Sequence, residues 1–192
     1  MRGTPGEYLE ELLRRGPLIL GQIHVSPSFS LCHAEDLGKD GLALYAAPHA
    51  ALELSKYTDS GLFRPLKSAN DLCHGWRLDL ASVAETLEAL DIFYPAALAI
   101  ALAFRQGRCR TTPLSATLER QTGMYAIVRK LTDEQAFEVE KSLCRHRCLR
   151  EIAWEPCRKA THSSSDNTPL WCIEACSLFV GEARRLLKAD PE

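Results

Sequence analysis

The sequence lacks the features that mark several classes of protein. Its 23 Lys and Arg residues are offset by 25 Asp and Glu residues, which leaves a formal charge of -2. No basic field therefore exists to hold nucleic acid or an anionic membrane. The longest apolar run, residues 94–104, is shorter than the roughly 20 residues needed to span a bilayer. The N-terminus also lacks the apolar segment and cleavage site of a secretory signal. We expect a cytoplasmic protein that binds neither nucleic acid nor a membrane.

Several catalytic motifs are missing as well. The sequence contains no Gly-x-x-x-x-Gly-Lys-Ser/Thr loop, no dinucleotide-binding glycine fingerprint, no His-Glu-x-x-His pair and no Gly-x-Ser-x-Gly elbow. The Cys-x-x-x-Cys-x-x-Cys motif of radical enzymes is absent too, because Glu151 stands where its third cysteine would be. None of the chemistry that these motifs carry is predicted.

What is present fits a folded protein of one domain or two small ones. The chain of 192 residues is 46% apolar and 25% charged, which are ordinary values for a globular protein. Helical spacing of apolar residues, strand-like runs and polar stretches alternate along it. Helices are expected at 6–15, 48–57, 82–93, 95–104, 132–152 and 173–188, strands at 17–25 and 42–46, and irregular segments at 26–40 and 59–79. The fold class is mainly α (α+β), with a weakly marked division into residues 1–80, a small α+β region, and 81–192, a helical region.

Two capping boxes give the sharpest helix starts. Ser82 is followed three residues later by Glu85, and Thr132 is followed by Gln135. In this arrangement each side chain satisfies a backbone N–H group of the other residue. Pro95 is expected to interrupt the first of these helices.

Cysteine is the most informative residue type. Eight are present, and five of them fall between positions 144 and 176. The cytoplasm keeps thiols reduced, so metal binding is a better explanation for a cluster of cysteines than a disulfide framework. Because the number of cysteines is even, four disulfides are possible if the protein is located in an oxidising compartment instead of the cytoplasm.

Two Cys-x-x-x-Cys pairs stand out, Cys144 with Cys148 and Cys172 with Cys176. Residues four apart lie on one face of a helix, with Cβ atoms about 5–6 Å apart. Four thiolates can therefore converge on a zinc ion held by four cysteines or on a [4Fe–4S] cluster. The cluster fits the wide helical spacing with less strain, but zinc and the absence of any metal both stay open on spacing alone.

The residues around the pairs favour the cluster. Trp154 and Trp171 could shield it from water, and the basic residues at 145–147 could offset its negative charge. Cys172 is expected at the start of the last helix, where the helix dipole favours a thiolate.

Other residues have weaker signals. Cys157 lies close to the pairs and could substitute as a ligand, whereas Cys32, Cys73 and Cys109 are expected to be buried apolar residues. His24 and His33 could form a second site, although isolated histidines are more often structural.

A further unusual segment, residues 120–125, could pack over the cluster or could simply end a helix at Gly123. Arg64, Arg120 and Arg129 could bind the carboxylates of an anionic tetrapyrrole. The alternative is that these arginines are solvated at the surface.

Several of these segments resemble a known family. They are residues 119–125, the first cysteine pair with Leu149, Trp154, residues 170–176, and, earlier in the chain, residues 61–66, 74–76 and 94–95. Together they resemble the [4Fe–4S] domain and preceding stabilising domain of deinococcal and cyanobacterial proteins that carry chelatase-like domains of the CbiX (sirohydrochlorin cobaltochelatase) type. The likeness covers roughly positions 55 to 188.

The resemblance implies that Cys144, Cys148, Cys172 and Cys176 ligate a [4Fe–4S] cluster in residues 81–192, with residues 1–80 as the stabilising region. Four cysteine ligands leave no iron open to a substrate, which favours a redox, electron-transfer or redox-sensing accessory, and the resemblance links this accessory to cobalamin or siroheme-type tetrapyrrole metabolism. The partner would be a chelatase, another tetrapyrrole-pathway protein or an electron donor. A chain of this length has no room for chelatase-like domains, so no chelatase activity is implied. The alternative is a structural zinc or iron–sulfur module that binds a partner, and a third hypothesis places an active site near His24 and His33.

Overall fold

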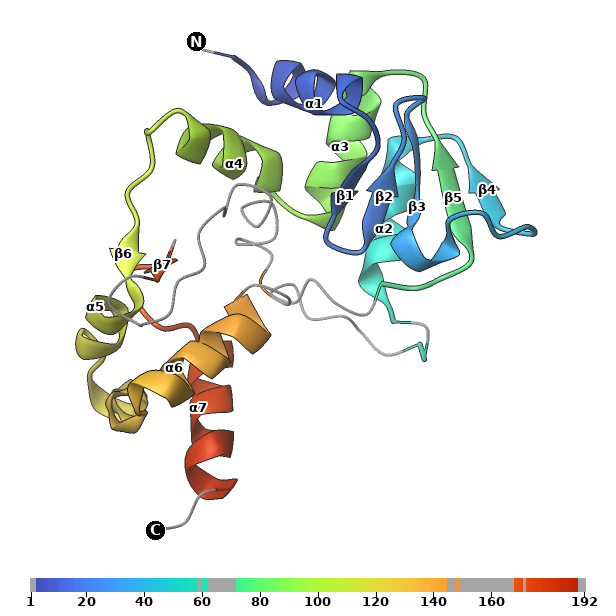
Figure 1. Cartoon of the computed structure of the whole chain (residues 1–192). Coiled ribbons are helices and arrows are strands. Elements are labelled where there is room, and N and C mark those ends of the chain that lie inside the picture. The colour runs from blue at the N-terminus through green and yellow to red at the C-terminus, as the bar shows by residue number, and fades with distance from the viewer. Residues whose placement is uncertain are drawn as a thin grey trace. The chain divides into compact units, whose positions relative to one another are not determined.

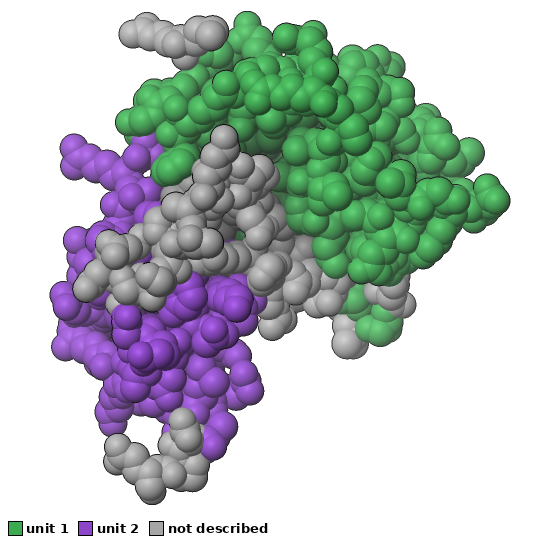
Figure 2. Space-filling view, in the orientation of Figure 1, with its two compact units in different colours: residues 1–108, 147–157 green, residues 109–146, 158–192 purple. Residues whose placement is uncertain are grey.

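The computed structural model describes residues 3–58, 60–61, 72–144, 148, 168–170 and 172–189. The chain divides into two compact units, which Figure 2 shows in different colours. The first comprises residues 1–108 and 147–157, and the second comprises residues 109–146 and 158–192. The division lies between Arg108 and Cys109, whereas the boundary predicted from the sequence lies near residue 80. The difference arises because the helices that follow residue 80 pack into the core of the first unit.

The first unit combines a five-stranded sheet with helices (Figure 1). Its elements in chain order are α1 (Pro5–Arg14), β1 (Leu18–Leu20), β2 (Ile23–Val25), β3 (Ser30–His33), the 3-10 turn η1 (Ala34–Asp36), β4 (Ala43–Tyr45), the 3-10 turn η2 (Pro48–Ala50), α2 (Ala51–Lys56), β5 (Trp76–Asp79), α3 (Val83–Phe93) and α4 (Ala97–Arg105). The strand order is β1-β2-β3-β5-β4, and only the β4–β5 pair is parallel. The core lies between the sheet and its helices, where the rings of Trp76 and Phe93 stack at a centroid distance of 5.2 Å.

The second unit is helical, with one two-stranded ladder. Its elements are β6 (Thr112–Pro113), α5 (Leu114–Glu119), the 3-10 helix η3 (Gly123–Lys130), α6 (Asp133–Val139), the π-helical turn η4 (Glu140–Cys144), β7 (Pro169–Leu170) and α7 (Ser177–Ala189). Helix α7 packs against α6 and η3 around a second hydrophobic core. The α+β fold class, with most of the ordered structure helical, is confirmed.

The predicted caps operate largely as expected. Thr132 and Gln135 form a complete capping box at the start of α6. Ser82 accepts a hydrogen bond from the backbone N–H of Glu85, but the Glu85 carboxylate accepts from Ala81 instead of Ser82. Pro95 separates α3 from α4, whose axes differ by 103°.

Two local expectations were wrong. The segment expected to be one strand at 17–25 is a hairpin, because Gly21 adopts a φ of 60° and allows a two-residue turn between β1 and β2. The segment expected to be irregular at 26–40 contains β3, which is stabilised by pairing with β2 on one side and β5 on the other. Such pairing is not visible in local sequence.

None of the described helices is by itself long and apolar enough to cross a membrane. Helices α3 and α4 reach the necessary length only in combination, across their sharp bend.

Candidate metal centre

Two of the C-terminal cysteines lie in or against the second hydrophobic core. The Cys144 side chain is 9% exposed and belongs to this core, and Cys176 packs against it. Phe179 and Val180 of α7 and Leu143 of η4 supply neighbouring apolar side chains. A metal group held here would have apolar surroundings on the protein side.

The first cysteine pair follows α6. After the capped start at Thr132, the regular helix gives way at Glu140 to a π-helical turn, which ends at Cys144. The wider turn changes the direction in which side chains leave the helix. The sequence expectation of one regular helix from 132 to 152 is therefore wrong at 140–144. Residues 145–147 and 149–152 lie outside the described part of the chain.

The second cysteine pair has two local contacts: a hydrogen bond from α5 to Cys172, and the start of α7 directly after Cys176. The Thr117 hydroxyl donates to the Cys172 carbonyl at 2.9 Å. The Gln121 side chain, itself buried, donates to the Thr117 carbonyl at 2.8 Å. This connection runs from the unusual 120–125 segment to Cys172. Gly123 begins η3 and does not cap α5, which already ends at Glu119.

Helix α7 starts later than the sequence indicated. It begins at Ser177, so Cys172 lies upstream of the helix and Cys176 lies immediately before it. The Cys176 carbonyl accepts a hydrogen bond from the Val180 N–H at 3.0 Å, as at the first turn of a helix. The predicted place of Cys172 at the start of the last helix is therefore wrong, and Cys176 is the cysteine that adjoins the first turn of α7.

The donor set suits an iron–sulfur cluster. None of the seven described cysteines forms a disulfide. Cys144, Cys172 and Cys176 belong to the second unit, whereas Cys148 belongs to the first. Thiolate sulfur is the protein ligand that [4Fe–4S] clusters use. The assignment of these four residues as ligands stays a prediction.

The remaining cysteines have structural surroundings. Burial raises the pKa of the Cys32 thiol, with a smaller contribution from Asp36, so this thiol resists becoming a thiolate. The Cys73 thiol donates a hydrogen bond to the Leu54 carbonyl at 3.2 Å, and Cys109 is half-buried. Cys157 lies outside the described residues, as do both tryptophans near the pairs, Trp154 and Trp171.

His24 and His33 do not form a joint site. In the β2–β3 ladder His24 stands opposite Cys32, while His33 stands opposite Ile23. Alternate residues of a strand point to opposite faces of the sheet, so the two histidines project to different sides. His33 instead lies beside His74, with ring centroids 3.8 Å apart. This pairing is not visible in the local sequence, because β5 follows β3 only after a long intervening segment.

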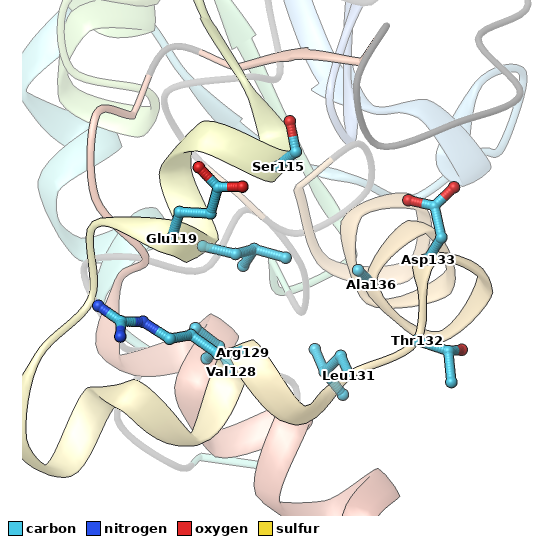
Figure 3. Close-up of a pocket in the computed structure, with 9 residues that line it drawn as sticks. Ser115, Glu119, Val128, Arg129, Leu131, Thr132, Asp133 and Ala136 are labelled. Carbon is cyan, nitrogen blue, oxygen red and sulfur yellow. The ribbon is translucent and has the colours of Figure 1, made fainter.

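A pocket of about 300 Å³ opens in the second unit between α5, η3 and the start of α6 (Figure 3). Leu118, Val128, Leu131 and Ala136 supply apolar lining. Arg129 is the single basic side chain among its lining residues and is accompanied by the acidic Glu119 and Asp133. This balance of charge disfavours a polyanionic tetrapyrrole. Arg120 is exposed, and Arg64 lies outside the described residues.

Comparisons with known proteins match both halves of the chain. Residues 7–105 match the model of the DR2241 stabilising domain, and residues 106–185 match the model of a 4Fe-4S iron-sulfur cluster binding domain. The two matches meet between residues 105 and 106, close to the division between the compact units. The [4Fe–4S] cluster is thus the cofactor of the C-terminal half, in agreement with the sequence analysis.

A solved structure is similar over nearly the whole chain. It is DR2241 from Deinococcus radiodurans, described as a multi-domain protein with structural similarity to chelatases and two additional novel domains. The identity is 28%, the TM-score is 0.65, and the match covers 97% of this chain but 41% of that one. The chain thus spans about two fifths of the length of that relative. No curated protein sequence matches the present chain.

Proposed function

Because the chain belongs to the DR2241 stabilising-domain family and carries a [4Fe–4S] cluster-binding half, we propose that it is an electron-transfer or redox-sensing accessory of a chelatase-like tetrapyrrole enzyme. The observation that carries the redox proposal is the donor set: four cysteines in two matched pairs, none of them in a disulfide. A [4Fe–4S] cluster, when bound, accepts and returns single electrons.

Four cysteine ligands account for every iron of such a cluster. No iron then stays open to a substrate, in contrast to metal sites that keep a coordination position for chemistry. The proposal therefore assigns electron transfer or sensing to the chain and assigns no bond-making step to it.

Contacts at two of the predicted ligands, Cys172 and Cys144, support this role. Thr117 holds the backbone at Cys172, and Gln121 holds the backbone at Thr117. Cys144 is buried in the apolar core. Hydrogen bonds and burial are the means by which a protein sets the potential of a cluster. The apolar surroundings of Cys144 oppose the gain of a negative charge and so favour a low potential.

What supports the tetrapyrrole link is the similarity to a multi-domain protein with structural similarity to chelatases. The proposed partner is accordingly a chelatase-like protein on a separate chain or in a longer version of this one. An electron donor is the second partner that the redox role requires.

The redox role is tested on protein purified without oxygen. Dithionite titration followed by optical and electron paramagnetic resonance spectroscopy should show one reversible electron per cluster, with a potential between about -700 and +450 mV. Oxidation should restore the initial spectrum without loss of iron. A cluster that cannot be reduced in this range, or that loses iron when reduced, would favour the structural module instead.

The partner is tested separately. A chelatase-like protein from the same organism should bind the cluster-loaded chain, and oxidised and reduced chains should differ in affinity for it. Equal affinity of the cluster-free and cluster-loaded chains would contradict a redox accessory.

A further inference from the structure

A second group of metal-binding side chains lies in the first unit, away from the cysteine pairs. His33 at the end of β3, Asp36 in η1 and His74 before β5 each offer a ligand atom, and these atoms all lie within 4.8 Å of one another. His33 and Asp36 are each 1% exposed, while the His74 side chain is 33% exposed. The group is therefore anchored in the protein and open to solvent on one side.

The local fold explains why the three residues meet. The antiparallel β3–β5 pairing brings the end of β3 next to the start of β5. Gly75, at a φ of 82°, turns the chain between His74 and Trp76. The backbone N–H of Gly75 then donates to Asp36 Oδ2 at 2.7 Å.

The Asp36 carboxylate is held in place by hydrogen bonds to both of its oxygens. Its second oxygen, Oδ1, lies 2.7 Å from Lys39 Nζ and 3.2 Å from His74 Nδ1. A fixed carboxylate beside two imidazoles is a donor set of two nitrogens and one oxygen.

We propose that His33, Asp36 and His74 bind a divalent transition-metal ion of the zinc class. Zinc takes imidazole and carboxylate ligands at about 2.0–2.2 Å, and three such ligands leave its fourth position open. Two tetrahedral ligands at about 2.0 Å are about 3.3 Å apart. The 3.2 Å separation between Asp36 Oδ1 and His74 Nδ1 agrees with this value.

The supporting contacts also fit a metal site. With Oδ1 on the ion, Oδ2 keeps its hydrogen bond to Gly75, which orients the ligating carboxylate in the way that outer contacts usually orient metal ligands. His33 Nδ1 accepts a long hydrogen bond of 3.2 Å from the Glu35 N–H. Binding at this nitrogen would exchange that bond for a coordinate bond.

Lys39 is the competitor for the ion. Its ammonium occupies the neighbourhood of Asp36 Oδ1, but its side chain is 58% exposed and can swing into solvent. Removing this charge should therefore strengthen metal binding. This expectation distinguishes a metal site from a purely structural hydrogen-bond cluster. In a structural cluster, loss of the Lys39 charge would only remove a hydrogen bond to Asp36.

The test uses the full chain with its iron–sulfur cluster loaded, under anaerobic conditions, so that the cysteine ligands are already occupied. One equivalent of Zn²⁺ is added, its affinity is measured by competition with a chelating dye, and its ligands are identified by zinc X-ray absorption. We expect one bound zinc with nitrogen and oxygen neighbours at about 2.0–2.2 Å and no sulfur at about 2.3 Å.

Variants locate the ion. His74→Ala and Asp36→Asn should each weaken zinc binding more than ten-fold, Lys39→Met should tighten it, and His24→Ala on the opposite face of the sheet should leave it unchanged. Circular dichroism verifies that each variant is folded. Zinc with sulfur neighbours, equal affinity in His74→Ala and the unaltered chain, or weaker binding in Lys39→Met would overturn the site. Because the readout is zinc, failure here leaves the cluster and its redox role untouched.

Discussion

At the scale of single residues, the cysteine thiols differ in burial and in hydrogen bonding. Cys144 lies in the second core, and Cys172 is held by Thr117. Cys32 is buried in the sheet, where its pKa is raised by the loss of solvation. A metal ligand needs a thiolate, so the surroundings of Cys32 oppose ligation.

The hydrogen bond to Cys172 gives a prediction for Thr117. Thr117→Val keeps the shape of the side chain but removes the hydroxyl donor, leaving the Cys172 carbonyl with one hydrogen bond fewer. We expect the free energy of unfolding to fall by about 1 kcal/mol and iron to be released faster to a chelator. Guanidinium titration and the rate of iron release measure the two effects.

Ser115→Ala is the matched control, because Ser115 lies on the same helix and lines the pocket. It should leave iron release unchanged. Equal rates for Thr117→Val and Ser115→Ala would show that the contact with Cys172 does not secure the cluster.

At the scale of elements, the parts with strong local signals could be predicted. The capping box at Thr132 and the break at Pro95 are encoded within a few residues of where they act. Strand β3 and the η4 turn depend on neighbours that are distant in sequence, so local periodicity could not reveal them. For the same reason the group of His33, Asp36 and His74 could not be predicted, because it forms where β3 and β5 pair. Cluster binding by the C-terminal half could be predicted from the paired cysteines and the family resemblance, while the choice of the four ligands stays a prediction.

The start of α6 gives a matched pair of threonine variants. Thr132→Ala removes a complete capping box and should cost about 1 kcal/mol of stability, within a usual range of roughly 0.5–2 kcal/mol. Thr122→Ala is the control, since Thr122 precedes η3 without a side-chain capping bond. Denaturant unfolding of the cluster-loaded chain compares them. Equal losses would mean that the cap does not stabilise the helix leading to Cys144.

The turn between β1 and β2 gives a second pair, of glycine variants. Gly21 has a φ of 60°, a conformation that costs alanine about 1 kcal/mol or more. Gly6 lies within α1, where alanine is the better helix former. Gly21→Ala should therefore lower the thermal midpoint, and Gly6→Ala should hold or raise it. A raised midpoint for Gly21→Ala would contradict the hairpin.

At the scale of the whole molecule, the chain contains two hydrophobic cores in two compact units. One is built on a sheet and matches the stabilising-domain family, and the other is built mainly from short helical segments and matches the cluster-binding family. Three of the four predicted ligands belong to the second unit. Since metal binding contributes directly to folding free energy, the two units should differ in their dependence on iron.

Hydrogen exchange should resolve this difference. When iron is removed anaerobically from the full chain, the amides of α6 and α7 should lose protection, while those of β2, β3 and β5 should keep it. Exchange followed by mass spectrometry in cluster-loaded and cluster-free protein gives the comparison. Equal loss in both units would show that the chain unfolds as one body.

The central claim is that Cys144, Cys148, Cys172 and Cys176 hold one [4Fe–4S] cluster. Its most direct test is anaerobic quantification of iron and sulfide in the unaltered chain, in the four single Cys→Ser variants and in Cys32→Ser. The account predicts about four irons and four sulfides per chain, retained in Cys32→Ser and largely lost from each of the four ligand variants. Full iron and sulfide in any of those four variants, or zinc in place of iron in the unaltered chain, would contradict it.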